Sequence, residues 1–284
     1  MSVAAAQRGV KGNSDFELYN PAKNVWYATS ADDCAFVATH WGTANDTVVA
    51  ADYDGDGQKD ASVWRAETGT WYIKRSSDAK AQIVRIENVK GDEPVPADYD
   101  GDGIADIAVF RSTTGEWIIL ESSKGFAQSK SDVKVFGRFG DIPVAADYDG
   151  DGKADLAVFR GSEDRWYITQ SSDGKTRSET FGIAGKDVLV PADYTGDGKA
   201  DLAVYRSGTW FVLSSETGKI DPFEFGFADD VAVPADYDGD GTVDFATFRK
   251  GTWYIYDSGK PKFRTFNFGN ENDIPLNSLS TKKS

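Results

Sequence analysis

Short apolar runs alternate with polar turns along this chain, in a unit that repeats roughly every 46 residues. Each unit contains a Val/Ala stretch such as 144–146, an apolar run such as 156–159, a Trp-headed segment, and a segment that usually ends in an aromatic–Gly pair. Gly, Ser, Asp and Thr fill the connections, as tight turns require. A period of 40–50 residues with four strand-like segments predicts the blades of a β-propeller.

One phrase recurs five times and fixes the register of the repeat. Its copies read ADYDGDGQKDASVWR from Ala51, ADYDGDGIADIAVFR from Ala97, ADYDGDGKADLAVFR from Ala146, ADYTGDGKADLAVYR from Ala192 and ADYDGDGTVDFATFR from Ala235. The copies are spaced by 46, 49, 46 and 43 residues. The apolar second strand of each unit is continuous, which indicates a sheet covered on both faces by neighbouring blades.

Trp and aromatic–Gly pairs mark the third and fourth strands. Trp heads the third strand at Trp71, Trp117, Trp166, Trp210 and Trp253. The pairs are Trp41-Gly42, Phe136-Gly137, Phe181-Gly182, Phe225-Gly226 and Phe268-Gly269, whereas Glu87-Asn88 stands in the remaining unit. The recurrent Trp side chains are predicted to form blade core, with sugar stacking as the alternative.

The two ends of the chain together supply a sixth blade. The chain begins inside a unit, after the place of its first strand, and Asp273-Ile274-Pro275-Leu276 repeats the first-strand segment Asp141-Ile142-Pro143-Val144. We therefore expect an all-β, six-bladed propeller of four-stranded antiparallel blades, closed by a C-terminal strand that completes the N-terminal blade and so removes free sheet edges. The expected boundaries within a single domain of residues 1–284 are a tail at 1–10, a composite blade at 11–45 plus 270–279, blades at 46–91, 92–140, 141–186, 187–229 and 230–272, and a tail at 280–284.

Each phrase contains a loop D-x-D-G-D-G-x-x-D, with Thr at position 3 of the fourth copy. Side chains at positions 1, 3, 5 and 9 and the carbonyl at position 7 can converge on one cation. The candidate ligands are Asp52, Asp54, Asp56, Gln58 and Asp60 in loop 1; Asp98, Asp100, Asp102, Ile104 and Asp106 in loop 2; Asp147, Asp149, Asp151, Lys153 and Asp155 in loop 3; Asp193, Thr195, Asp197, Lys199 and Asp201 in loop 4; and Asp236, Asp238, Asp240, Thr242 and Asp244 in loop 5.

The donor set favours calcium. Hard oxygen ligands in this number suit Ca²⁺, whereas Mg²⁺ prefers a smaller octahedral site. Without a cation the clustered carboxylates would repel one another. An EF-hand is excluded because it needs Glu at position 12 between helices, and position 12 here is Val or Thr inside a strand. About five structural calcium ions are therefore expected, and they would reduce the formal net charge from −15 to −5.

These loops and aromatic–Gly pairs resemble the FG-GAP/VCBS repeats of integrin α-subunit propellers and of many secreted bacterial proteins, over residues 11–279. The resemblance implies that each loop joins the first two strands of its blade and binds Ca²⁺. It implies no metal in the composite blade, where Gln7, Gly9 and Lys11 replace the first three aspartates. It also implies a secreted or cell-surface protein, because extracellular modules bind calcium with Kd of roughly 10⁻⁴–10⁻³ M.

The composition disfavours nucleic acid and the membrane interior as partners. A net charge of −15 disfavours nucleic acid, and no apolar run approaches the length of a membrane span. Residues 1–10 lack the features of an intact signal peptide, so a signal would have been removed. The single cysteine, Cys34, cannot form an internal disulfide and is expected to be a buried apolar residue.

Catalysis has little support, so we expect a binding, adhesion or scaffold module rather than an enzyme. The only histidine, His40, is expected to be a packing or surface residue, and the distinctive aspartates belong to the metal loops. The expected partner is a protein or a glycan. A lectin with sugar sites between blades is an alternative, suggested by the Trp set and by Arg65, Arg111, Arg160, Arg206 and Arg249; a polysaccharide-degrading domain is another. The sequence does not identify the ligand or the oligomeric state.

Overall fold

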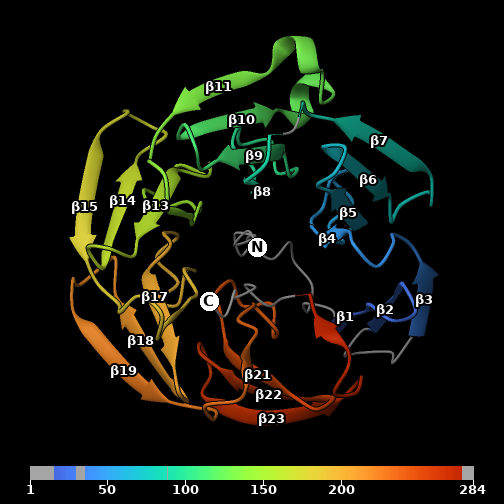
Figure 1. Ribbon diagram of the computed structural model, residues 1–284. Coiled ribbons are helices and arrows are strands. Elements are labelled where there is room, and N and C mark those ends of the chain that lie inside the picture. The colour runs from blue at the N-terminus through green and yellow to red at the C-terminus, as the bar shows by residue number, and fades with distance from the viewer. Residues whose placement is uncertain (1–15, 30–35, 88, 277–284) are drawn as a thin grey trace. The chain divides into compact units, whose positions relative to one another are not determined.

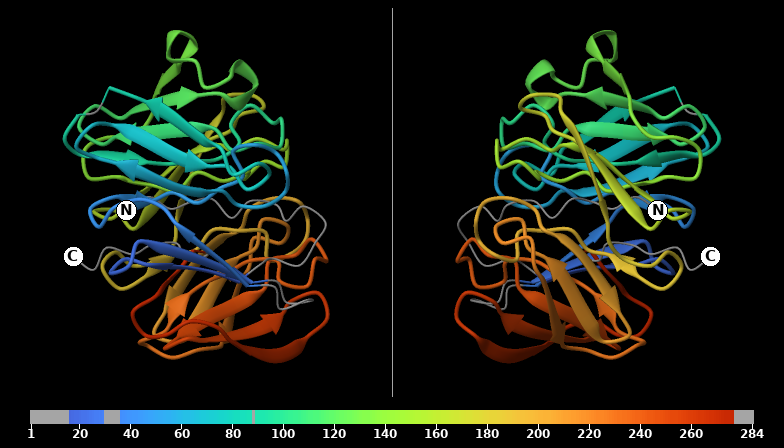
Figure 2. Two further views of the ribbon diagram at one scale, coloured as in Figure 1. Left: turned by 90° about the vertical axis from the view of Figure 1, so that its right-hand side faces the viewer. Right: turned by 90° about the vertical axis from the view of Figure 1, so that its left-hand side faces the viewer.

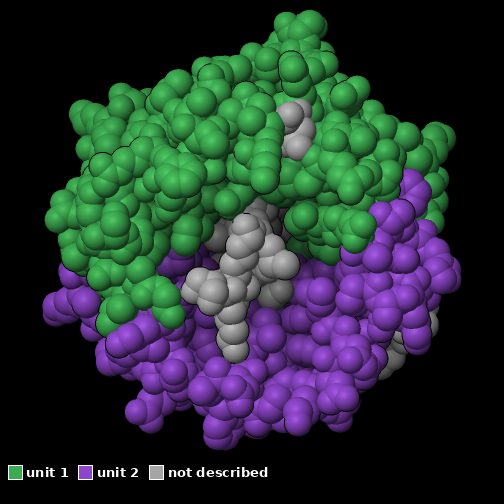
Figure 3. Space-filling view, viewed as in Figure 1, with its two compact units in different colours: residues 1–5, 45–185, 282–284 green, residues 6–44, 186–281 purple. Residues whose placement is uncertain are grey.

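A computed structural model describes residues 16–29, 36–87 and 89–276 and contains six sheets of four antiparallel strands (Figure 1). The expected fold class, a six-bladed β-propeller, is confirmed. The blades divide between two compact units, of which unit 1 includes residues 45–185 and unit 2 includes residues 6–44 and 186–281 (Figure 3). All strands fall within the expected blade boundaries, and the single domain stays a prediction.

Unit 1 contains blades 1 to 3, which are numbered after their loops. Their strands are β4 (Thr47–Val48), β5 (Ala61–Arg65), β6 (Thr70–Lys74) and β7 (Ala81–Arg85); β8 (Asp92–Pro94), β9 (Ile107–Arg111), β10 (Glu116–Leu120) and β11 (Asp132–Val135); and β12 (Ile142–Pro143), β13 (Leu156–Arg160), β14 (Arg165–Thr169) and β15 (Thr176–Thr180). Two 3₁₀ turns, η1 (Ser122–Lys124) and η2 (Gln128–Lys130), lie between β10 and β11, and Figure 2 shows this connection standing out from unit 1.

Unit 2 contains blades 4 and 5 and the composite blade. Their strands are β16 (Val188–Leu189), β17 (Leu202–Arg206), β18 (Thr209–Leu213) and β19 (Ile220–Glu224); β20 (Val231–Ala232), β21 (Phe245–Arg249), β22 (Thr252–Asp257) and β23 (Lys262–Asn267); and β24 (Ile274–Pro275), β1 (Phe16–Asn20), β2 (Val25–Thr29) and β3 (Phe36–His40). Along the part of the chain that the structure describes, no helix is long and apolar enough to cross a membrane.

The composite blade joins the two ends of the chain as expected. β24 is the innermost strand of its sheet and pairs with β1, with Leu18 opposite Pro275 (Figure 1). The amide of Leu276 donates to the carbonyl of Glu17 at 3.0 Å, and the Asn20 side chain donates to Asp273 at 2.6 Å. The last strand therefore completes the first blade.

The recurrent Trp residues form the core, which confirms that prediction. The five recurrent Trp side chains that head the third strands of blades 1 to 5 are fully buried, so none of them offers a face to a sugar ring. Trp117 belongs to one buried cluster with Val95 of its own blade and Val158 of blade 3, and its indole N–H donates to the carbonyl of Phe136 at 2.8 Å. This core lies between neighbouring blades of a unit, so the position of each blade depends on the next.

Blade 1 differs from the other blades at the indole N–H of Trp71, which lacks the hydrogen bond that Trp117 makes. Ile86 takes the place of the aromatic residue, because its amide bonds Gly69 as the amide of Phe136 bonds Gly115. Glu87 therefore stands where the other blades have glycine with φ from 85° to 110°, a conformation that is costly for a side chain. The Trp71 indole N–H consequently finds no acceptor among the described residues, whereas its counterparts bond the carbonyl before that glycine.

Candidate metal centres

The five Asp loops join the first and second strands of blades 1 to 5, and each is closed at its base by one pair of backbone contacts. In loop 1, Asp60 forms an isolated bridge with Ala51, and its amide donates to the Ala51 carbonyl at 2.8 Å. The same bridge closes the other four loops, at Ala97–Asp106, Ala146–Asp155, Ala192–Asp201 and Ala235–Asp244. The bridge fixes position 9 beside position 1, so that one ion can contact both side chains.

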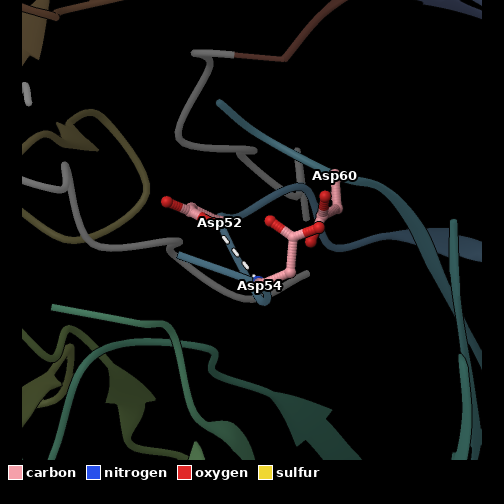
Figure 4. A group of neighbouring side chains, drawn as sticks. All are labelled: Asp52, Asp54 and Asp60. Atoms are coloured by element: carbon pink, nitrogen blue, oxygen red, sulfur yellow. Dashed lines mark hydrogen bonds between the residues drawn. The ribbon is translucent and has the colours of Figure 1, made fainter. Parts of the chain in front are cut away.

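Carboxylates at positions 1, 3 and 9 converge in four of the loops. One oxygen atom from each of Asp52, Asp54 and Asp60 lies within 4.8 Å of the others (Figure 4). The equivalent groups are Asp98, Asp100 and Asp106; Asp147, Asp149 and Asp155; and Asp236, Asp238 and Asp244. Because Ca²⁺ binds oxygen at 2.3–2.6 Å, two ligands of one ion lie at most about 5 Å apart. These oxygen atoms therefore fit a calcium ion.

The aspartate at position 1 shapes the loop with both of its oxygen atoms. Asp52 Oδ1 accepts a hydrogen bond from the Gly55 amide at 2.6 Å, and Oδ2 accepts one from the Gly57 amide at 2.8 Å. Both glycines have positive φ, 81° and 87°, which glycine adopts at little cost. The same two bonds occur in loops 2 to 5, so the position 1 aspartate curves the backbone of every loop in the same way.

The aspartate at position 9 is the most deeply buried ligand. Asp60 is fully buried, accepts the Tyr53 amide at 2.9 Å and the Ser76 amide at 2.7 Å, and lies near Asp54. Burial raises the pKa of Asp60 from 3.8 to about 6. Burial also raises the pKa of Asp106 to about 7, of Asp155 to about 6 and of Asp244 to about 7, and raises that of Asp201. A cation in the loop would favour the ionised form of these groups.

Position 5 lies outside the converging groups. Asp56 accepts the Gln58 amide at 2.8 Å through Oδ1 and the Ser76 hydroxyl at 2.8 Å through Oδ2. Serine occupies the same place beside Asp102, Asp151 and Asp197. The carbonyls at position 7 belong to the residues whose amides donate to position 5, namely Gln58, Ile104, Lys153, Lys199 and Thr242. That positions 5 and 7 bind the ion stays a prediction.

The serines that follow the third strand are site residues that the sequence reading missed. Ser76 contacts Asp56 and Asp60, and Ser77 donates to Asp54 at 2.5 Å. A Ser-Ser pair recurs at the same place as Ser122-Ser123 and Ser171-Ser172, and that recurrence was the available signal. Through these bonds the metal loop is attached to the turn between the third and fourth strands.

Loops 4 and 5 depart from the common pattern. In loop 4, Thr195 replaces a carboxylate and its hydroxyl lies 3.5 Å from Asp201, so the converging acidic groups of the described chain are those of loops 1, 2, 3 and 5. In loop 5, the buried Asp257 lies near Asp238 and Asp244 and is paired with Arg264 at 2.8 Å. Loop 5 is therefore richer in carboxylates than loop 4. In the composite blade, the places of Gln7, Gly9 and Lys11 lie outside the described residues, as does Cys34.

Replacement of Thr195 by Asp is expected to strengthen calcium binding in loop 4 by roughly one order of magnitude, because calcium affinity rises with the charge of the ligand set. Thr195→Asn, which adds an oxygen without a charge, is the matched control and should give a smaller gain. Isothermal titration with calcium measures both. Equal affinities for the two variants and the unmodified protein would show that position 3 of loop 4 does not contact the ion.

A second repeated cluster lies at the other end of the second strand. Arg160 Nε and Nη2 donate to the two carboxylate oxygens of Asp141, both at 2.8 Å. The same pair recurs as Arg65–Asp46, Arg111–Asp92, Arg206–Asp187 and Arg249–Asp230. These arginines are therefore engaged within their own blades, and the proposed Trp and Arg sugar site is wrong for these residues.

Comparison with known proteins agrees with this architecture. The family model described as FG-GAP-like repeat matches residues 98–158 and 147–204, which include loops 2, 3 and 4. Residues 98–204 therefore match FG-GAP-like repeats, which confirms the resemblance expected from the loops in this part of the chain. None of the curated protein sequences matches this chain.

Solved structures share the fold at low sequence identity. A lectin from Agrocybe aegerita, described as recognising non-reducing terminal N-acetylglucosamine, is 15% identical, with 93% of this chain and 81% of the lectin covered and a TM-score of 0.58. TolB from Acinetobacter baumannii is 16% identical over 94% of this chain and 64% of TolB, with a TM-score of 0.62. A streptogramin B lyase is 10% identical over 94% of this chain and 87% of the lyase, with a TM-score of 0.57.

Proposed function

We propose that this protein is a calcium-stabilised binding module, secreted or displayed at the cell surface, that recognises a protein or a glycan. The observation that carries the proposal is the convergence of three carboxylates within 4.8 Å in four copies of one loop. Such a cluster is costly without a cation, because like charges at this separation repel. The FG-GAP-like repeats that contain three of the five loops support the same conclusion.

Calcium in these loops would be structural. The position 9 aspartate of each loop bonds the amide of a serine after the third strand, as in Asp106 with Ser122 at 2.7 Å. An ion that fixes Asp98, Asp100 and Asp106 therefore also orders the connection between the third and fourth strands. Calcium affinities of extracellular modules, roughly 10⁻⁴–10⁻³ M, suit the millimolar calcium outside cells.

A binding role is favoured over catalysis by the use of the acidic residues. The repeated aspartates belong either to the Asp loops or to ion pairs with arginine. The repeated Trp side chains are buried and form part of the core. We place the ligand surface on the blade connections and not on the Trp set. A polysaccharide-degrading activity is the less favoured alternative, and the lectin among the structural neighbours favours testing glycans first.

Calcium titration of chelator-treated protein tests the metal part of the proposal. We expect four or five ions per chain with Kd of about 10⁻⁴–10⁻³ M by isothermal titration calorimetry. Asp106→Asn should remove one strong site, whereas Asp173→Asn, in an exposed turn, should remove none. Absence of binding at millimolar calcium would refute the proposal.

A glycan array in calcium-containing buffer then tests the ligand class. Repeated binding to one sugar type, abolished by chelator, identifies a lectin. Silence on the array, with capture of a defined extracellular protein only in calcium, identifies a protein ligand. Turnover of a polysaccharide by the purified chain would instead support the enzymatic alternative.

A further inference from the structure

Neighbouring metal loops are joined by one hydrogen bond that runs between the blades of a unit. The Ala105 amide in loop 2 donates to the Asp52 carbonyl in loop 1 at 2.7 Å. The Ala154 amide in loop 3 donates in the same way to Asp98 in loop 2, also at 2.7 Å. In unit 2, the Val243 amide of loop 5 donates to Asp193 of loop 4 at 2.8 Å. In each of these three bonds, the backbone amide at position 8 of one loop donates to the backbone carbonyl at position 1 of the preceding loop.

The peptide group that makes this bond belongs to two candidate metal sites. The N–H of Ala105 and the C=O of Ile104 lie in one planar peptide unit, and that carbonyl is the candidate ligand at position 7 of loop 2. The acceptor is the carbonyl of Asp52, whose side chain is the ligand at position 1 of loop 1. No described peptide bond is cis, so the C=O and N–H of this unit point in opposite directions.

Side-chain packing strengthens the same connection. A Cβ atom placed on Gly55 of loop 1 would lie 3.0 Å from the Ile104 side chain, and one on Gly101 of loop 2 would lie 3.0 Å from Lys153. In unit 2, a Cβ atom on Gly196 would lie 2.8 Å from the Thr242 hydroxyl. The residue at position 7 therefore covers the position 4 glycine of the preceding loop, so that the two loops are in side-chain contact as well as hydrogen-bonded.

We propose that calcium sites in neighbouring loops of one unit bind calcium cooperatively through this shared peptide group, and the inference rests on the proposed calcium binding. An ion that fixes the position 7 carbonyl also fixes the attached N–H, which then orders the first ligand of the preceding loop. Coordination of the carbonyl withdraws electron density from the peptide and makes its N–H a stronger donor. Couplings of this kind typically change affinity by roughly 5- to 150-fold.

Loop 4 is the site where the coupling matters most. It lacks a carboxylate at position 3, and its Asp193 accepts the hydrogen bond from loop 5, which is rich in carboxylates. Calcium in loop 5 is therefore expected to raise the affinity of loop 4 by at least about fivefold. Because coupling is reciprocal, loss of loop 4 should weaken loop 5 by the same factor.

The full chain, titrated with calcium and weighed by native mass spectrometry, tests the proposal without any substitution. Independent sites, whatever their individual affinities, give a distribution of bound ions no wider than the binomial distribution with the same mean. Positive coupling widens the distribution, whereas unequal affinities, such as those expected for loops 4 and 5, narrow it. We expect a width above the binomial near half-saturation; a width at or below it, together with unchanged remaining affinities in the loop variants below, would overturn the coupling.

Two matched double variants then test whether the coupling joins loops 4 and 5. Asp238→Asn with Asp244→Asn disables loop 5, and should remove two ions at a calcium concentration that saturates loop 4 in the unmodified protein. Asp193→Asn with Asp197→Asn disables loop 4 and should weaken loop 5 by the same factor. Loss of a single ion with unchanged remaining affinities would contradict the coupling. Absence of any calcium binding in the unmodified chain would instead refute the proposed function itself.

Discussion

In metal-free buffer the protein is expected to lose thermal stability as the pH rises from about 5 to about 8, whereas in millimolar calcium it should gain stability over the same interval. The two trends have one cause, which is the buried aspartate at position 9 of each loop. Burial raises the pKa of Asp60 and Asp155 to about 6 and that of Asp106 and Asp244 to about 7. In the unfolded chain the same groups titrate near 3.9.

The sign follows from proton uptake. Between pH 4 and 7 the metal-free folded state binds more protons than the unfolded state, so its stability falls as the pH rises through the folded pKa values. With calcium the order reverses, because protons compete with the ion for the same carboxylates and the competition weakens as the pH rises. The metal-free form should therefore be destabilised at pH 8, relative to pH 5, by roughly 1–3 kcal/mol for each of the four loops.

Calcium should restore this stability and add to it. At a calcium concentration 10 to 100 times Kd, each occupied loop contributes roughly 1.4–2.7 kcal/mol. With about 2 °C of Tm for each kcal/mol in a chain of this size, the difference between calcium and chelator at pH 8 is expected to be about 10–20 °C. Calorimetric scans at several pH values, with and without chelator, measure both slopes.

Variants in a single loop provide the control. The residue introduced by Asp155→Asn cannot titrate, so the metal-free protein should lose less than one quarter of its pH dependence, because Asp106 and Asp244 titrate at higher pH and contribute more, while the other loops keep theirs. Parallel pH profiles with and without calcium would mean that the buried aspartates neither bind the ion nor titrate in the folded protein.

The fold and the convergence of aspartates in the loops could be predicted because both follow from repeated local sequence. The phrase ADYDGDG returns with little change, and the glycines at positions 4 and 6 specify the curved backbone that the structure contains. The C-terminal strand could be predicted because Asp273-Ile274-Pro275 repeats the segment at Asp141-Ile142-Pro143. Repetition thus served as an internal comparison of one blade with another.

Contacts between distant positions were harder to predict. The bond between neighbouring loops joins Asp52 to Ala105, and nothing in the repeat indicates that a backbone amide of one copy faces a carbonyl of another. The exclusion of position 5 from the converging group depends on the rotamer that lets Asp56 accept the Ser76 hydroxyl. Such choices are made by packing in three dimensions and not by the residue type.

The partners of the repeated arginines were not predicted, for a different reason. Arginine beside Trp suggested a sugar site, whereas each arginine is paired with an aspartate 19 residues earlier. This constant separation of 19 residues was present in the sequence. It pointed to an ion pair that joins the first two strands of blades 1 to 5.

Removal of one of these ion pairs is expected to cause the second large loss of stability, measured as the free energy of unfolding. Asp141 is almost fully buried, receives both Arg160 bonds, and also accepts the Arg138 amide at 3.0 Å. Asp141→Ala removes the bidentate partner of the Arg160 guanidinium, leaving it a longer contact with Glu163 at 3.8 Å, and removes an acceptor from the turn before β12. Breaking a buried pair by removing one partner costs about 3–5 kcal/mol. Urea unfolding in calcium at neutral pH measures this loss of free energy.

The composite blade supplies the matched control, because its pair carries only one charge. There Asn20 takes the place of the arginine and donates to Asp273 at 2.6 Å. Asp273→Ala leaves a neutral amide behind, so the expected cost is about 1–3 kcal/mol. If the charge of Arg160 is what makes Asp141→Ala expensive, then Arg160→Met combined with Asp141→Ala should recover part of the loss. Equal costs for Asp141→Ala and Asp273→Ala, with no recovery in the double variant, would assign the effect to the turn hydrogen bond that both aspartates accept.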